Sequence, residues 1–167
     1  MSYWIVVGSA ENFHIAIDRG FDLFGFKSTR RGMAGKMAPG DKLIFYLTGI
    51  MKFGGIATVV SESFEDHEPI FRSKKAGEDY PFRVQTKADI VLNEEDWLDV
   101  TEWAPRLEYT KKWAPEHWRL AFQGNLRQIP EADYVLIETE MKARANTGSQ
   151  ARASVRRASK KKAKGKA

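Results

Sequence analysis

Strand-like segments outnumber helical ones in this sequence, and the two kinds do not alternate regularly. Runs of apolar and β-branched residues predict strands at 3–8, 41–48, 53–64 and 80–92, and the second and third of these flank a tight turn typical of a β-hairpin. Helical spacing is clearest at 11–19 and 130–143. A doubly wound α/β fold requires strands and helices in regular succession. The pattern therefore predicts a compact α+β domain with a mixed, barrel-like sheet.

Two local features refine this expectation. Gly54 and Gly55 lie inside a predicted strand and indicate a bulge or a close approach of another segment. In the last predicted strand, Phe82 and Val84 alternate with polar residues such as Arg83, which assigns Arg83 to the polar face. A polar loop, residues 65–79, precedes that strand.

Charge is divided unevenly along the chain, and this division suggests two parts. The 167 residues carry a net charge of +5, but from Lys142 onward there are ten basic and no acidic residues. Residues 1–141 therefore hold 17 basic against 22 acidic side chains, a net charge of −5. We expect one folded domain at 1–141, large enough to bury a core, and a basic tail at 142–167.

The tail is predicted to be disordered. Val155 is its one large aliphatic residue and it has no aromatic residue, so it cannot offset an ordering entropy of about 1–2 kcal/mol per residue. A polycationic arm suits a phosphate backbone, because neutralising phosphates releases counterions whatever the base sequence. An incidental or solubilising extension is the alternative. The cations expected to contact a nucleic-acid backbone are Arg156, Arg157, Lys160, Lys161 and Lys162.

The composition excludes several classes of protein. No cysteine is present, which removes disulfides, thiol catalysis and cysteine-ligated zinc. No apolar run approaches the roughly 18 residues of a membrane span, and the N-terminus does not resemble a signal peptide. We therefore expect a soluble cytoplasmic protein that needs no metal or cofactor and does not associate with membranes.

The first predicted strand runs into GSAEN, residues 8–12, and a glycine at this place suggests a phosphate loop. The segment matches no glycine pattern of nucleotide-binding loops, and Glu11 would repel a pyrophosphate. Ser9, His14 and Asp18 form only a weak candidate triad, because the strand–turn–helix elbow of such enzymes is missing. The EDHE segment at 65–68 is a candidate cation site, but a solvated surface turn is the favoured interpretation.

Aromatic residues beside hydrogen-bonding side chains indicate a base-binding pocket instead. Phe24 is a candidate stacking platform, since the adjacent Gly25 would let a planar ring approach closely. Ser9 and Asn12 offer a hydroxyl and an amide to the edge of a base. Positive charge for the nucleic-acid backbone would come from Arg30, Arg31 and Lys36.

Six motifs follow one another along the chain: YWIVVGSAENF, FGF, PGDKLIFYLTG, FGGIATV, YPFRV and AFQGNLRQIP. Together they resemble the EVE domain, a family of the PUA-like superfamily that is related to YTH domains. The resemblance covers about residues 2–137. It implies a small barrel-like β-sheet surrounded by short helices. It also implies a pocket that reads a flipped or single-stranded modified base without catalysis, typically a methylated cytosine or adenine in DNA or RNA.

The resemblance also implies which residues line that pocket. By position, Ser9 and Asn12 belong to it and Phe24 is a cage wall. The FYLTG segment contributes Tyr46 and Thr48. The QGNLR segment places Gln123, Gly124 and Arg127 near the mouth of the pocket. Similar proteins commonly have tryptophan where Phe13 and Phe24 stand. Phenylalanine stacks over less area and lacks the indole N–H, which alters the expected strength and base preference of the cage.

These observations predict a monomeric module that binds nucleic acid carrying a modified base and passes the result to a separate effector protein. Two other classes remain open. One is an enzyme that acts on a nucleotide-like ligand, and the other is a protein-interaction domain whose pocket is incidental.

Overall fold

Eight strands form one mixed sheet in the part of the chain that the structure describes, residues 1–164, with side chains described as far as residue 147. This computed structural model has the strand order β2-β6-β4-β3-β1-β8, with β5 paired to β6 and β7 paired to β4. Strands β1 and β3 are parallel, and the other pairs are antiparallel. The strands are β1 (Tyr3–Gly8), β2 (Leu23–Phe26), β3 (Lys42–Leu47), β4 (Lys52–Val59), β5 (Phe64–Glu65), β6 (Phe82–Val91), β7 (Leu98–Asp99) and β8 (Leu126–Ile129).

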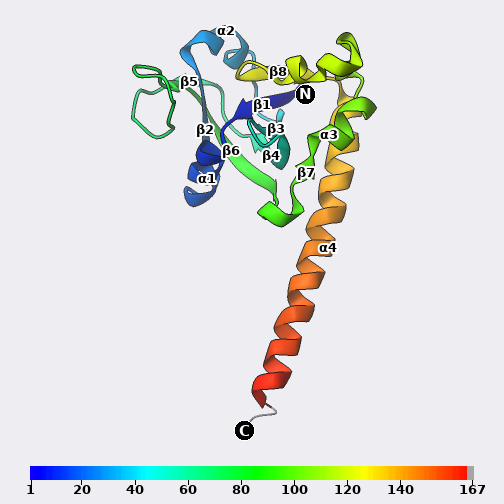
Figure 1. Ribbon diagram of the computed structural model, residues 1–167. Coiled ribbons are helices and arrows are strands. Elements are labelled where there is room, and N and C mark those ends of the chain that lie inside the picture. Colours follow the sequence, from blue (N-terminus) through cyan, green and yellow to red (C-terminus); the bar gives the residue numbers. More distant parts are fainter. Residues whose placement is uncertain (165–167) are drawn as a thin grey trace.

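Short helices and the N-terminal part of the long helix α4 lie around the sheet, which curls into a half-barrel (Figure 1). The fold therefore has the predicted α+β class and barrel-like sheet. None of the helices in residues 1–164 combines the length and the apolar character needed to cross a membrane. The helices are α1 (Ala10–Asp18), α2 (Arg31–Ala34), α3 (Val100–Trp103) and α4 (Glu131–Lys164), and the 3-10 helices are η1 (Ser28–Arg30), η2 (Glu94–Asp96), η3 (Ala104–Arg106), η4 (Tyr109–Lys112) and η5 (Pro115–Phe122).

Helix α1 follows β1 directly because Ser9 caps it. The Ser9 hydroxyl accepts a hydrogen bond from the backbone N–H of Asn12 at 3.1 Å, which satisfies a free donor of the first turn. Phe13, on the buried side of the helix, packs against Phe45 of β3. Gly20 follows the helix with φ of +75°, a conformation that favours glycine. The helix predicted at 11–19 is confirmed.

The predicted hairpin is formed by β3 and β4, and its two glycines allow close packing. A Cβ atom at Gly54 would lie 2.9 Å from the ring of Phe13. A Cβ atom at Gly55 would lie 2.6 Å from the carbonyl oxygen of Ile90 on β6. The close approach predicted for this glycine pair is confirmed.

Replacing Gly55 with alanine should destabilise the fold by about 1–3 kcal/mol, because the new methyl group meets backbone that cannot move aside like a flexible side chain. The matched control is Gly32→Ala in α2, where a Cβ meets nothing within 4 Å. The control should change the free energy of unfolding by less than about 1 kcal/mol. Urea denaturation measures both changes, and equal stability of the two variants would contradict this account of Gly55.

Strands β2 and β8 are not predicted by the sequence pattern. Each has four residues, which is too short for a clear alternation of apolar and polar side chains. Each is completed by a partner far away in the sequence, β6 for β2 and β1 for β8. The polar face expected for Arg83 is also wrong. Arg83 is only 2% exposed, because β5 and the loop after it cover this end of β6.

The last helix begins after Pro130 as predicted and buries Ile137 and Met141 against the core. It continues beyond the boundary expected at residue 141. Ala145 still packs against the core, and the Arg144 guanidinium donates a hydrogen bond to the carbonyl oxygen of Trp97 at 3.2 Å. Residues 142–147 are therefore helical, where the sequence predicts a disordered tail. Helix α4 is assigned as far as Lys164. The tail cations Arg156, Arg157, Lys160, Lys161 and Lys162 lie outside the residues whose side chains are described.

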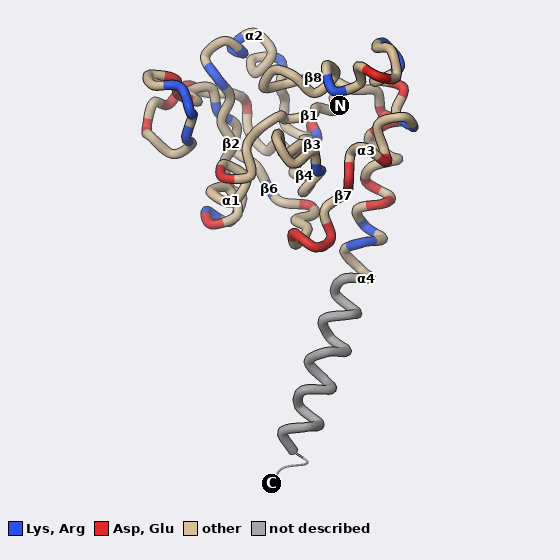
Figure 2. Tube along the Cα trace, viewed as in Figure 1, with Lys and Arg blue, Asp and Glu red and all other residues tan. Residues whose placement is uncertain are grey.

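Figure 2 shows one concentration of basic residues and one of acidic residues on the folded domain, with both signs mixed elsewhere. Lysine and arginine residues gather around α2 and β8, whereas acidic residues gather in the turn between β6 and β7, which carries η2 and its three carboxylates. The net charge of the domain thus conceals a basic region and an acidic region. A basic region of this kind attracts anionic partners at long range.

Candidate functional site

Asn12 lies where α1 meets the loop that precedes β6, and its side chain is only 2% exposed. Its Nδ2 donates to the carbonyl oxygen of Arg72 at 2.9 Å, and its Oδ1 accepts from the backbone N–H of Arg72 at 2.8 Å. The Arg72 side chain is 76% exposed and forms an ion pair with Glu11 at 3.4 Å. The amide of Asn12 therefore binds the backbone of Arg72, and in this structure it is not open to solvent.

Phe24 is buried, at 4% exposure, and is not an open stacking platform in this structure. Its ring packs against Phe45, with the centroids 4.9 Å apart, and against Phe71, at 5.0 Å. The physical reason is that the loop before β6 places Phe71 beside it. The role of Phe24 as a cage wall stays a prediction, and in this structure Phe71 covers its ring.

Gly25 allows the close approach that the sequence predicts, but the approaching group belongs to the protein itself. A Cβ atom at Gly25 would lie 2.8 Å from the carbonyl oxygen of Tyr80 and 3.1 Å from the ring of Phe71. Any larger residue at position 25 would push this loop away from β2. The planar ring admitted by Gly25 is thus that of Phe71.

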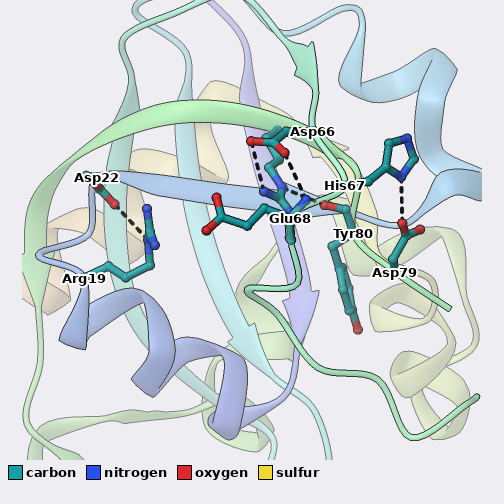
Figure 3. A network of polar contacts seen from close by, with 8 residues as sticks. Arg19, Asp22, Asp66, His67, Glu68, Asp79 and Tyr80 are labelled. Carbon is teal, nitrogen blue, oxygen red and sulfur yellow. Dashed lines mark hydrogen bonds and ion pairs between the residues drawn. The ribbon is translucent and has the colours of Figure 1, made fainter. Parts of the chain in front are cut away.

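We call residues 66–80 the strap, and Arg83 holds both of its ends. The buried guanidinium donates from Nε to the carbonyl oxygen of Tyr80 at 3.0 Å and from Nη2 to the carbonyl oxygen of Glu68. Its Nη1 forms an ion pair with Asp66 at 3.5 Å. Figure 3 shows Asp66, Glu68 and Tyr80 gathered at one place, although they lie at opposite ends of the strap. One buried cation therefore fixes where the strap begins and ends.

A second tether joins Glu78, near the C-terminal end of the strap, to Lys27, the residue after β2. The carboxylate of Glu78 accepts from the Ser73 hydroxyl at 2.8 Å and forms an ion pair with Lys27 at 3.0 Å. The hydrogen bond from Ser73, followed by that from Lys27, lowers the pKa of Glu78. Since Lys27 follows β2 directly, this tether brings the strap beside Phe24 and Gly25.

His67 forms an exposed ion pair within the strap (Figure 3). Its Nδ1 lies 2.9 Å from Asp79, and its Nε2 lies 3.5 Å from Glu65. The hydrogen bond with Asp79 is the main cause that raises the pKa of His67 above its ordinary value of 6.5. The pKa is raised in the folded state, so the pair stabilises the strap fully below pH 6.5 and loses this effect as the pH rises through the raised pKa.

Replacing Asp79 with asparagine should lower the pKa of His67, because the charged hydrogen-bond partner is lost. NMR titration of the imidazole protons of His67 measures the change in the wild type and the variant. The matched control is Asp89→Asn, which removes a carboxylate paired with Lys42 rather than with His67. An unchanged pKa in Asp79→Asn would show that the ion pair does not form in solution.

Tyr46 lies in a different aromatic group from Phe24. Its ring stacks on Phe122, with the centroids 4.6 Å apart and the planes 8° from parallel, and burial raises the pKa of its hydroxyl. Its neighbour Phe45 contacts Phe24 instead. Successive side chains of a strand point to opposite faces of a sheet. Phe45 therefore packs with Phe24, whereas Tyr46 packs with Phe122. The structure therefore does not bring Tyr46 together with Asn12 and Phe24.

The loop before β8 holds the remaining predicted residues beside the end of β1. The Arg127 guanidinium donates to the carbonyl oxygen of Gln123 at 2.8 Å. Gly124 has φ of +82°, and the guanidinium of Arg30 lies directly over it, so a side chain at position 124 would displace Arg30. Thr48 is exposed at the end of β3, and its N–H donates to the carbonyl oxygen of Gly8 at 2.8 Å.

Asn125 organises this corner, and the sequence interpretation missed it. Its side chain is 3% exposed, donates to the carbonyl oxygen of Val7 at 3.1 Å and accepts from the N–H of Lys27 at 3.0 Å. It thereby joins the ends of β1, β2 and β8. An asparagine that directly follows Gly124 was the available signal.

Phe71 and Arg72 were also missed, because their partners Phe24 and Asn12 lie far away in the sequence. Arg83 was missed because its alternation with Phe82 and Val84 suggests an exposed side chain.

The three basic residues predicted to contact a backbone lie on or beside α2. Arg31 and Lys36 are exposed, and Arg30 is half-buried over the loop before β8. The guanidinium of Arg31 lies 5.9 Å from the centre of the Phe82 ring, which holds its stem against the domain. These cations belong to the basic region seen around α2 (Figure 2).

The candidate catalytic and cation-binding groups have structural partners. The Ser9 hydroxyl caps α1, and the imidazole of His14 lies 3.1 Å from Glu94. In the EDHE segment, Asp66 pairs with Arg83 and His67 pairs with Asp79. In the part of the chain that the structure describes, no three acidic or histidine side chains gather in a way that could hold a metal ion.

Comparison with known protein sequences identifies a matching family and two similar proteins. The family model described as "EVE domain" matches residues 2–140. A UPF0310 protein of Pyrococcus abyssi is 31% identical over 148 residues, covering 83% of this chain and 99% of that protein. A UPF0310 protein of Pyrococcus horikoshii is 29% identical over 148 residues, covering 83% of this chain and 97% of that protein.

Comparison with solved structures identifies proteins of similar fold. The Pho92 YTH domain in complex with m6A matches with a TM-score of 0.61 at 15% identity, covering 84% of this chain and 83% of that one. The Mmi1 YTH domain in complex with RNA matches with a TM-score of 0.59 at 15% identity, covering 84% and 80%. At this level of identity the likeness shows a shared fold. The predicted relation of the fold to YTH domains is confirmed.

Proposed function

The chain belongs to the EVE domain family, and we propose that it is a non-catalytic module that binds nucleic acid through one modified base. The observation that carries this proposal is the position of Asn12. Its buried primary amide is hydrogen-bonded to the backbone of Arg72. Arg72 directly follows Phe71, whose ring contacts those of Phe24 and Tyr80. An amide next to aromatic rings combines the two means by which proteins read a base outside the duplex, namely edge hydrogen bonds and stacking.

The chemistry of this site suits a base in single-stranded or flipped form. An asparagine amide offers one donor and one acceptor side by side, which pairs with the edge of a base such as adenine. Stacking on an aromatic side chain contributes about 1–3 kcal/mol per base. Burial of one methyl group adds roughly 0.8 kcal/mol. Recognition of a methylated base therefore needs the shape of the site and the edge contact as well as the methyl group.

The basic region would hold the backbone of the same nucleic acid. Arg30, Arg31 and Lys36 lie around α2, and the tail adds further cations beyond the described side chains. Such contacts raise affinity without selecting a sequence, and they weaken as salt is added. The YTH domains that share this fold were solved with RNA or with m6A, which supports the proposed class of ligand.

The test is a comparison of matched oligonucleotides. Single-stranded RNA and DNA probes that carry one N6-methyladenine or one 5-methylcytosine are titrated by fluorescence anisotropy beside their unmodified counterparts. We expect at least one modified probe to bind more tightly than its counterpart at the same salt concentration. Equal affinity for every modified and unmodified pair would refute base reading.

Replacing Asn12 with alanine should weaken binding of the preferred probe by about 1–3 kcal/mol, because the edge contact is lost. Asn146→Ala is the matched control, since Asn146 is exposed on α4 and should leave affinity unchanged. Circular dichroism of both variants checks that the fold persists. Unchanged affinity in a folded Asn12→Ala protein would remove Asn12 from the site.

A further inference from the structure

The strap occupies the place at which the base is proposed to bind. Phe71 presents an aromatic ring to Phe24, with the centroids 5.0 Å apart, and lies against Gly25. The next residue, Arg72, presents its backbone N–H and carbonyl oxygen to the amide of Asn12, at 2.8 and 2.9 Å. One ring with an adjacent donor and acceptor is also what a nucleobase would offer to the same side chains.

We infer that the strap is an intramolecular stand-in for the base, and that Phe71 and Arg72 must leave Phe24 and Asn12 before nucleic acid binds. This inference rests on the proposed function and adds to it the regulation of the same site. The closed form gives a hydrogen-bond partner to both polar atoms of the buried Asn12 amide. The strap thereby covers the proposed site until the edge of a nucleobase displaces Arg72 from Asn12.

The strap is built so that its middle can move while its ends stay in place. Arg83 holds the carbonyl oxygens of Glu68 and Tyr80, which lie on either side of Phe71 and Arg72. Phe71 is the buried hydrophobic residue of the strap, whereas residues 74–77 are exposed. A segment with so few buried side chains opens at a free energy well below that of global unfolding.

Closure has a measurable consequence for affinity. If only a fraction of the molecules is open, the apparent dissociation constant exceeds the intrinsic one by the inverse of that fraction. A change that weakens closure without touching a side chain of the site should therefore tighten binding. The backbone N–H of Arg72 is such a target, since the Arg72 side chain is 76% exposed and pairs with Glu11 at the surface.

The experiment compares Arg72→Pro with Arg72→Ala in the full chain. Both variants lose the same side chain and its ion pair, but only proline removes the N–H that donates to Asn12. The probes are the single-stranded RNA with one N6-methyladenine and the single-stranded DNA with one 5-methylcytosine. We expect Arg72→Pro to bind its preferred probe about three- to tenfold more tightly than Arg72→Ala. Equal or weaker binding by a folded Arg72→Pro protein would overturn the inference.

A spin label gives a second measurement that does not depend on the proline variant. The chain has no cysteine, so Lys75→Cys accepts a single nitroxide on the exposed part of the strap. Glu102→Cys on α3 is the control position. We expect saturating probe to raise the mobility of the label at residue 75 and not at residue 102. A label at residue 75 that is unchanged when the probe is bound would overturn the inference.

The outcomes separate this inference from the proposed function. If the modified probes bind the wild type and both Arg72 variants alike, base reading stands and the stand-in role of the strap is refuted. If no modified probe is preferred even by the folded Arg72→Pro protein, base reading itself fails, and the inference about the strap falls with it.

Discussion

Replacing Phe24 with alanine should destabilise the protein by about 3–5 kcal/mol, because a large buried ring is removed from the aromatic group that it forms with Phe45 and Phe71. The cavity left behind lies within β2, a buried strand of four residues that is paired with β6. Urea denaturation followed by tryptophan fluorescence measures the loss.

Phe64→Ala is the matched control for this prediction. Phe64 is also a phenylalanine in a short strand, but it is 37% exposed, so its removal should cost less than about 1 kcal/mol. If Phe24→Ala were as stable as Phe64→Ala and lost affinity for the modified probe, Phe24 would be the open stacking platform that its place in the sequence suggests.

Replacing Arg83 with methionine should destabilise the protein by about 2–4 kcal/mol. Removing one partner of a buried charge pair costs about 3–5 kcal/mol, and the cost is reduced here because the Asp66 side chain is 44% exposed. The carbonyl oxygens of Glu68 and Tyr80 also lose their donors. We expect amide hydrogen exchange to increase most in the strap, ahead of the rest of the domain.

Arg19→Met is the control for this second prediction. Arg19 forms an ion pair with Asp22 at 3.3 Å, but the two side chains are 37% and 60% exposed, and such a pair contributes less than about 1 kcal/mol (Figure 3). Equal exchange in the strap of Arg83→Met and Arg19→Met would show that Arg83 does not hold the strap.

Much of the fold was predictable because its signals are local. Helical spacing at 11–19 predicts α1, and two strand-like segments around a tight turn predict the β3–β4 hairpin. The glycine pair in β4 predicts close packing, and the contacts of Gly54 and Gly55 confirm it. Six motifs in order were sufficient to identify the EVE family.

The candidate site was predicted only in part. Asn12 and Gly25 were predicted to contact a base. In this structure both contact the strap, Asn12 through Arg72 and Gly25 through Phe71 and Tyr80. Phe24 is buried because Phe71 packs against it. No residue near Phe24 in the sequence indicates this contact. Arg83 alternates with apolar residues like a solvent-facing side chain, and it is buried because the strap surrounds its guanidinium.

The sequence by itself determined the class of fold, the family, and the uneven division of charge along the chain. These depend on composition and on spacing over a few residues, which residue types alone express. Only the tertiary structure decided what faces Asn12, because its partner Arg72 lies 60 residues further along the chain. A hydrogen bond across that separation depends on how β2, β6 and α1 pack together, and no local pattern records such packing.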